Sequence, residues 1–294
     1  MEHNRIFITG VGGQLGKALL AQFDGALGKT SQELDITDFQ SLDRINWKDY
    51  DTIINAAAYT KVDQAETQEG RIRAWKVNVM GVFNLGKIAM KHNLTFVHYS
   101  SDYVFDGRLQ NHTETEDFSP LGVYGQTKAA GDFIASLLPK HYVIRTSWVI
   151  GDGNNFVRTM LGLAQRGINP SVVNDQIGRL SFTKDLALAT DYLLSSSADV
   201  GVYNVSNDGE PSSWADITRT IFELANLKNL YVSEVSTEDY FKDKQGSSPR
   251  PLNSTLDLSK LKNTGFNPKD WKQVLKDYIK QEGDNMKNNS GLVN

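Results

Sequence analysis

The chain of 294 residues contains no cysteine, and only five of its residues are histidine. The lack of cysteine excludes disulfide bonds, thiolate metal ligands and a cysteine nucleophile. No two histidines have the HxxxH spacing or a similar spacing of zinc ligands, so we expect no metal ion.

Long apolar runs and long runs of one charge are also missing. No window approaches the ~20 apolar residues of a membrane helix, and the N-terminus begins with a short polar stretch instead of an apolar signal segment. The 31 basic and 35 acidic residues are scattered and give a net charge of −4. This balance argues against nucleic acid or a membrane as partner. We expect a cytoplasmic protein that binds small molecules.

Short apolar runs alternate with helical patterns through the first half of the chain. The runs are RIFIT, DTIINAA, TFVHYSS and YVIRTSWVI. Regular alternation of strand and helix is typical of βαβ units, and near-continuous apolar strands fit a sheet covered on both faces. The pattern predicts an α/β fold with a Rossmann-type, doubly wound parallel sheet.

The alternation loosens after residue 150, which indicates a second unit. We expect a dinucleotide-binding Rossmann domain over 1–150, to which 171–204 returns. A smaller C-terminal substrate-binding lobe would take 151–170 and 205–284. Residues 285–294 are polar, and we expect a flexible tail there.

A glycine turn, ITGVGGQLG, follows the first expected strand and begins the first helix. Gly10 permits a tight turn, Gly13 lets the backbone approach a pyrophosphate, and Gly16 allows close packing of the helix on the sheet. The helix N-terminus supplies N–H donors and positive dipole to the phosphates. Its place in a βαβ pattern predicts a dinucleotide site.

Asp35 lies about twenty residues beyond this turn, where an acidic residue can contact the ribose of NAD. In a second interpretation Asp35 lies on the following loop near the adenine, while the second strand ends over 29–31. A 2′-phosphate would then be tolerated by Lys29 or Ser31. We favour the second interpretation, which predicts that NADH and NADPH both serve as cofactor.

Tyr124 and Lys128 are four residues apart in a predicted helix, so they share one face. Ser101 ends a predicted strand, at the sheet edge where α/β proteins bind ligands. Reduction of a carbonyl requires a proton for the oxygen, which a phenol can donate. We expect a nearby ammonium to lower the pKa of Tyr124, and a serine hydroxyl to hydrogen-bond the same oxygen.

The motifs as a set are more specific than the Tyr-Lys pair. They are TGVGGQLG, ELDITD, NAAAYTKVDQAE, SSDYVFDG, YGQTKAAGD, RTSWVIG, NNFVRTML and RPLNSTLD. With them the chain resembles the extended short-chain dehydrogenases/reductases, and among these the dTDP-4-dehydrorhamnose reductases. The resemblance implies reduction of the C4 ketone of dTDP-4-dehydro-L-rhamnose to dTDP-L-rhamnose with NADPH or NADH.

The resemblance also implies roles by position. The catalytic residues would be Ser101, Tyr124 and Lys128. The dinucleotide would be bordered by Gly10, Gly13, Gln14, Leu15, Asp35, Ile36, Ala56, Ala57 and Tyr59, together with Tyr124 and Lys128. The sugar nucleotide would contact Val62, Ser101, Tyr103, Trp148, Asn155 and, at its pyrophosphate, Arg250. Composition alone would make Trp148 a packing residue.

The chain departs from the family pattern in three places. The catalytic hydroxyl is serine where threonine is frequent, which keeps the donor. A DQxGxPT run reads DQIGRLSF, with Leu180 and Ser181, so the loop shape there is in doubt. Some members resemble metal-bridged dimers that use an acid in the first helix, but QLGKALLAQF has none. We expect a monomer or a homodimer without a metal bridge.

Four other functions compete with this interpretation. A 4,6-dehydratase needs an Asp-Glu pair after the catalytic hydroxyl, where this chain has Asp102 and Tyr103, and combined epimerase-reductases use a cysteine. A reductase of another nucleotide 4-keto sugar would share nearly all these motifs. A regulatory relative, such as the reductase-like beta subunit of methionine adenosyltransferase, would keep the fold while serving a partner protein. The last two stay open.

Overall fold

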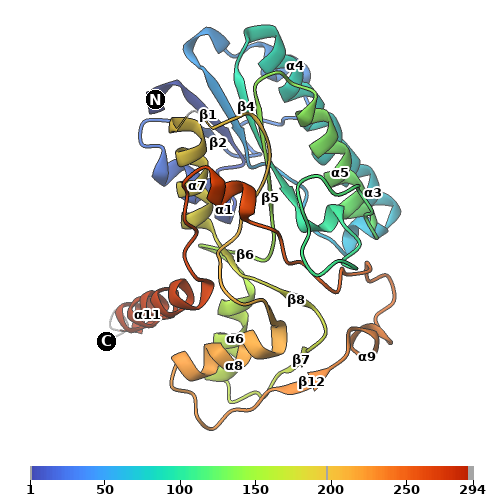
Figure 1. Cartoon of the computed structure of the whole chain (residues 1–294), viewed down its shortest axis with the longest axis vertical. Coiled ribbons are helices and arrows are strands. Elements are labelled where there is room, and N and C mark those ends of the chain that lie inside the picture. The colour runs from blue at the N-terminus through green and yellow to red at the C-terminus, as the bar shows by residue number, and fades with distance from the viewer. Residues whose placement is uncertain (1, 197, 291–294) are drawn as a thin grey trace.

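The computed structural model describes residues 2–196 and 198–290, which form a sheet domain and a smaller lobe (Figure 1). The sheet has six strands in the order β10-β5-β4-β3-β1-β2, and every neighbouring pair is parallel. The strands are β1 (Ile6–Thr9), β2 (Leu27–Lys29), β3 (Thr52–Asn55), β4 (Thr95–Ser101), β5 (His141–Thr146) and β10 (Gly201–Asn204). The strand order turns back between β1 and β3, so the predicted doubly wound parallel sheet is confirmed.

Helices cover both faces of this sheet. On one face lie α1 (Gln14–Gln22) and α7 (Thr183–Ser195), and on the other α2 (Phe39–Asp43), α4 (Val82–His92) and α5 (Val123–Ser136). A helix α3 (Gln68–Trp75) continues through a π-helical segment η4 (Lys76–Gly81) into α4. Successive residues of β1 face opposite layers: Ile6 and Ile8 pack with α1 and α7, and Phe7 packs with α4. This burial on two sides explains the near-continuous apolar strands.

The lobe has its own core, built from α6 (Phe156–Gln165), α8 (Trp214–Leu224) and the first turns of α11 (Trp271–Ser290). Three short strand pairs frame it: β7 (Ser171–Val173) with β12 (Ser233–Val235), β8 (Ile177–Gly178) with β11 (Ser212–Ser213), and β6 (Val149–Ile150) with β9 (Ser181–Phe182). The remaining elements are α9 (Thr237–Phe241), α10 (Ser259–Asn263), η1 (His3–Arg5), η2 (Trp47–Asp49), η3 (Gln64–Glu66) and η5 (Asp102–Val104).

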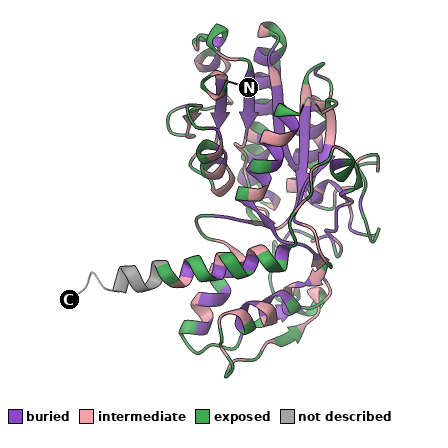
Figure 2. Ribbon diagram, turned by 60° about the vertical axis from the view of Figure 1, so that its left-hand side comes forward, coloured by how far each residue is buried: buried purple, intermediate pink, exposed green. Residues whose placement is uncertain are grey.

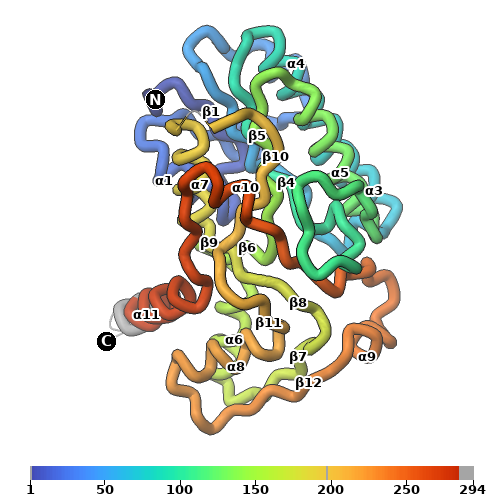
Figure 3. The backbone as a smooth tube through the Cα atoms, viewed as in Figure 1, coloured from blue at the N-terminus to red at the C-terminus, as the bar shows by residue number. Residues whose placement is uncertain are grey.

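The chain crosses between the two parts more often than the sequence predicted, as the path of the tube in Figure 3 shows. Only α7 and β10 of the expected return segment 171–204 join the sheet domain, because β7 and β8 pair with strands of the lobe. Conversely Leu261, from the range expected in the lobe, packs in the core of the sheet domain, where its helix α10 contacts β10. Strands of two or three residues carry too little periodicity to predict such crossings.

The C-terminal helix α11 runs away from the body of the molecule (Figure 2). Residues 285–290, expected in a flexible tail, continue this helix, and 291–294 lie outside the described residues. Within the described part of the chain, no helix has the length and apolar character needed to cross a membrane.

Candidate active site

A cleft of about 1090 Å³ lies between the carboxyl ends of the sheet strands and the lobe. It brings together most residues that the sequence predicted: Gly10, Gly13, Gln14, Leu15, Asp35, Ile36, Ala56, Ala57, Tyr59, Val62, Ser101, Tyr103, Tyr124, Lys128 and Trp148. A second hollow of about 340 Å³, beside α7, is lined by none of them. The larger cleft is therefore the candidate site.

The glycine turn forms one end of the cleft. Gly10 has φ +75°, and a Cβ there would lie 2.5 Å from the amide nitrogen of Ala57, so only glycine fits. A Cβ at Gly16 would overlap the carbonyl oxygen of Gly10, so α1 packs directly on the turn. Gly13 is the N-cap of α1 and has no side chain to cap the first turn. The N–H groups of that turn are therefore available to an anion, which fits a dinucleotide diphosphate.

The end of β2 borders the same turn, because the carbonyl oxygen of Lys29 accepts the N–H groups of Gly10 and Val11. Asp35 lies beyond the strand, on the loop, and its carboxylate accepts the N–H of Thr37 at 2.9 Å. Asp35 thus lies on the loop after β2, as the favoured interpretation expected, and its place near the adenine stays a prediction. β2 itself ends at Lys29, so Thr30 and Ser31, which this interpretation counted in the end of the strand, follow it.

The sequence analysis also left out Glu33, which does not line the cleft itself but binds Thr30, which does. Its carboxylate folds back on the end of β2, where it accepts the N–H and the hydroxyl of Thr30, each at 2.8 Å. The ammonium of Lys29 lies 3.7 Å away. The spacing Thr30-x-x-Glu33 resembles a capping box, and that signal could have found this residue.

The three catalytic candidates meet at the middle of the cleft. Ser101 ends β4, while Tyr124 and Lys128 lie on one face of α5. The buried ammonium of Lys128 donates to the carbonyl oxygen of Tyr99 at 2.5 Å. The hydroxyl of Ser101 donates to the carboxylate of Asp102 at 2.8 Å. The fold therefore gives Ser101 and Lys128 each an identified hydrogen-bond partner.

Burial sets the protonation of these groups. It raises the pKa of Tyr124 above its ordinary value and lowers the pKa of Lys128 to about 8. It also raises the pKa of the Asp102 carboxyl to about 6. The expectation that the ammonium lowers the pKa of Tyr124 is wrong here, because the loss of solvation around the phenol is the larger effect. A raised pKa keeps the phenol protonated and able to donate.

The lobe contributes an aromatic wall. Trp148 has φ 45°, which is rare for a bulky residue and marks a backbone held under strain. Its indole stacks on that of Trp214, with ring centres 3.8 Å apart and an interplanar angle of 17°. Gly178 lies behind it, where a Cβ would come within 2.9 Å of the Trp148 ring. Trp214 also lines the cleft, and the sequence analysis missed it because no local pattern separates it from a core tryptophan.

Two predicted residues do not line the cleft. Asn155 caps α6, and its amide donates to the carbonyl oxygen of Gly151 at 2.9 Å and to the hydroxyl of Tyr278 at 2.9 Å. Arg250 pairs with the carboxylate of Asp63 at 2.8 Å. Asp63 directly follows Val62 in the cleft wall, so Arg250 lies at the rim.

Comparison with known proteins agrees with this geometry. The model of the family described as RmlD substrate binding domain matches residues 4–283. A dTDP-4-dehydrorhamnose reductase of Aggregatibacter actinomycetemcomitans is 40% identical over 92% of this chain and 97% of its own length. One from Mycolicibacterium smegmatis is 34% identical over 94% of this chain and 85% of its own.

Solved structures give the same result. A dTDP-4-dehydrorhamnose reductase of Bacillus anthracis, in complex with NADP, has a TM-score of 0.86 at 34% identity and covers 94% of this chain and 99% of its own. The dTDP-glucose 4,6-dehydratase DesIV of Streptomyces venezuelae shares the fold, with a TM-score of 0.79 at 18% identity over 96% of this chain and 97% of its own. The glycine turn, the grouped catalytic candidates and both comparisons lead to the same family. The chain belongs to the dTDP-4-dehydrorhamnose reductase family.

Proposed function

We propose that the chain reduces the C4 ketone of dTDP-4-dehydro-L-rhamnose to dTDP-L-rhamnose, with NADPH or NADH as cofactor. The observation that carries this proposal is a single cleft in which Ser101, Tyr124 and Lys128 lie beside a glycine turn. The relatives' names supply the sugar. The chemistry requires only the groups that line this cleft.

The cofactor supplies a hydride to the carbonyl carbon when it is bound. The uncapped first turn of α1 would hold its diphosphate, and the candidates that border it are Gly10, Gly13, Gln14, Leu15, Asp35, Ile36, Ala56, Ala57 and Tyr59. Glu33 and Lys29 flank the cleft-lining Thr30 at the end of β2, where they would offer a partner to a 2′-hydroxyl and to a 2′-phosphate respectively. We propose that both cofactors are used.

Tyr124 donates its phenolic proton to the carbonyl oxygen as negative charge develops there. The ammonium of Lys128, whose pKa lies near 8, is mostly charged at pH 7 and stabilises the phenolate that remains. Ser101 must turn its hydroxyl from Asp102 to the substrate oxygen in order to donate to it. Tyr124 then regains a proton from solvent, which completes the cycle.

The sugar nucleotide would lie against Val62, Tyr103 and Trp148, which line the cleft beside Ser101. Arg250 would reach the pyrophosphate by exchanging Asp63 for phosphate oxygens, which suit its planar fork of donors. Asn155 would act from behind the wall, since its amide holds the backbone of 151–153.

The assembly remains a prediction. Among the described residues, no group of three or more His, Asp or Glu side chains is placed to hold a metal ion. We propose a monomer or a homodimer without a metal bridge, located in the cytoplasm. Sedimentation with and without magnesium tests the first point, and a magnesium-dependent dimer would contradict it.

The direct test is to supply purified protein with enzymatically prepared dTDP-4-dehydro-L-rhamnose and to follow NADPH and NADH oxidation. We expect turnover with both cofactors and dTDP-L-rhamnose as the product identified by mass and NMR. Turnover only with another nucleotide 4-keto sugar would show that the substrate assignment is wrong. Cofactor binding without turnover of any such sugar would favour a regulatory role.

A further inference from the structure

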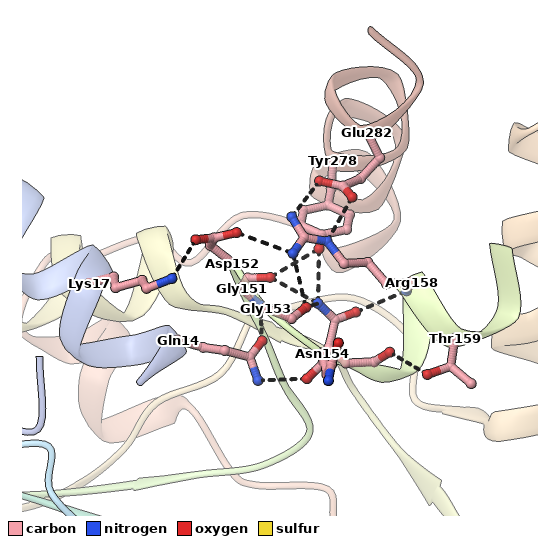
Figure 4. A network of polar contacts seen from close by, with 11 residues as sticks. Gln14, Lys17, Gly151, Asp152, Gly153, Asn154, Arg158, Thr159, Tyr278 and Glu282 are labelled. Carbon is pink, nitrogen blue, oxygen red and sulfur yellow. Dashed lines mark hydrogen bonds and ion pairs between the residues drawn. The ribbon is translucent and has the colours of Figure 1, made fainter. Parts of the chain in front are cut away.

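The segment 151–155 leads from the sheet domain into the lobe and lies against the start of α1 (Figure 4). The side chain of Gln14 holds it at two points. Its amide oxygen accepts the N–H of Gly151 at 2.9 Å, and its amide nitrogen donates to the carbonyl oxygen of Asn154 at 3.2 Å. Gln14 was expected to touch the dinucleotide, yet its polar atoms are engaged by this crossing segment.

A chain of ion pairs runs parallel to these hydrogen bonds. Lys17, one turn further along α1, lies 2.8 Å from Asp152, and the other carboxylate oxygen of Asp152 lies 3.2 Å from Arg158 in α6. Arg158 in turn pairs with both carboxylate oxygens of Glu282 in α11, at 2.7 and 2.9 Å. Asp152 therefore connects the dinucleotide-binding helix to two helices of the lobe (Figure 4).

The crossing segment is shaped for this place. A Cβ at Gly151 would lie 2.5 Å from the hydroxyl of Thr183, and Gly153 has φ +127°. The hydroxyl of Tyr278 donates to the carbonyl oxygen of Gly151 at 3.0 Å. Because the segment is tied to the lobe as firmly as to α1, contacts with Gln14 and Lys17 decide where the lobe sits.

The same residues border the cleft, since Gln14, Lys17, Asp152, Gly153 and Asn154 all line it. We propose that Gln14, Lys17 and Asp152 are positioning residues, which hold the lobe in the placement that both ligands require before either one binds. We call these three residues the latch. The proposal rests on the proposed dinucleotide site. Its predicted consequence is that the free protein is already competent to bind.

A broken latch has a specific signature. If the lobe samples other placements, only a fraction of the molecules can bind a ligand that needs the competent placement. The apparent dissociation constant for that ligand is then the intrinsic constant divided by this fraction. The first ligand to bind restores the placement, so the second ligand no longer meets this loss. Loss of the latch should therefore weaken NADPH binding and make it depend on dTDP.

The test is a fluorescence titration of NADPH, with and without saturating dTDP, on Lys17→Met and Asp152→Asn. An exposed ion pair contributes little, so we expect each dissociation constant for NADPH to rise about two- to fivefold without dTDP. With dTDP bound, the difference from wild type should shrink. Lys17→Arg, which keeps a cation opposite Asp152, should retain tight binding. Lys91→Met, which breaks the exposed pair with Asp43 at 2.7 Å on the far side of the sheet domain, is the matched control.

Direct electrostatic contact predicts another result. If Lys17 and Asp152 acted only on the charge of the diphosphate, Lys17→Met would weaken NADPH binding and Asp152→Asn would strengthen it. Opposite signs, unchanged dissociation constants or equal increases with and without dTDP would each overturn the latch. If dTDP fails to bind wild type, the sugar-nucleotide assignment fails, and the signs of the two NADPH shifts still decide the latch.

Discussion

The sheet domain and the lobe hold their sides of the cleft by different means. Ser101 ends a seven-residue strand that pairs with β3 over its first four residues and with β5 from its second residue to Ser101, and Lys128 lies within a fourteen-residue helix. In the lobe, Trp148 and Trp214 are held by a strained backbone, a glycine behind one ring and strands of two residues. Backbone hydrogen bonds of a long strand and a long helix hold the catalytic candidates in place, whereas side-chain packing holds the two tryptophans that face them.

This difference assigns different tasks to the two regions. Ser101 and Lys128 are buried and Tyr124 is half-buried, and loss of solvation has shifted the pKa values of Tyr124 and Lys128. The lobe side of the cleft carries aromatic surface and no proton donor that the reaction requires. We therefore expect changes in the sheet domain to act on kcat and changes in the lobe to act on KM.

The largest effect should follow Tyr124→Phe. Removal of the proton donor should lower kcat by about 10²–10⁴-fold, the usual contribution of general acid catalysis. NADPH affinity should remain, because no backbone group of the glycine turn is altered. Steady-state kinetics and an NADPH titration measure the two effects. Tyr192→Phe, which removes a hydroxyl bonded to Thr264 far from the cleft, should have wild-type kcat. A fully active Tyr124→Phe variant would refute the assigned role.

On the lobe side, Trp214→Ala should raise the KM for the sugar nucleotide by about two- to twelvefold, since an aromatic pair contributes about 0.5–1.5 kcal/mol beyond its buried area. The kcat and the affinity for NADPH should change less than threefold, because Trp214 stacks on Trp148 and not on the glycine turn. Trp75→Ala, in α3 and partly exposed, is the control. A fall in kcat with constant KM would contradict the inference that changes in the lobe act on KM and changes in the sheet domain act on kcat.

The same contrast explains what the sequence revealed. The sheet domain has longer strands, regular helices and a glycine turn, and these local signals predicted the parallel sheet and the residues now grouped in the cleft. The contacts that assemble the lobe join residues far apart in the chain: Gln14 meets Gly151, and Arg250 meets Asp63. Such pairs leave no local pattern, and two-residue strands leave almost none. Trp214 and the extra chain crossings were therefore missed.

The titration of Lys128 tests the sheet side of the comparison. Its pKa is lowered to about 8 by burial, so the ammonium is present below pH 8 and is lost as the pH rises above it. Because catalysis requires the charged form, kcat/KM, which reports the pKa values of the free protein, should fall roughly tenfold per pH unit above pH 8. Lys128→Arg carries a charge that does not titrate in this range and should show a flat profile up to pH 10, at a lower rate. An equal decline in this variant would assign the titration to another group.

The smallest effect concerns the choice of cofactor at the end of β2. Glu33 can accept a ribose 2′-hydroxyl and repels a 2′-phosphate, while the ammonium of Lys29 attracts the phosphate. Glu33→Gln should therefore raise the ratio of kcat/KM for NADPH to that for NADH by about two- to fivefold, and Lys29→Gln should lower it by a similar factor. Asp35→Asn is the matched control, because its carboxylate turns to the N–H of Thr37, and its ratio should stay within twofold of wild type. If Asp35→Asn shifted the ratio and Glu33→Gln did not, the ribose contact would belong to Asp35, and the interpretation that places it near the adenine would be wrong.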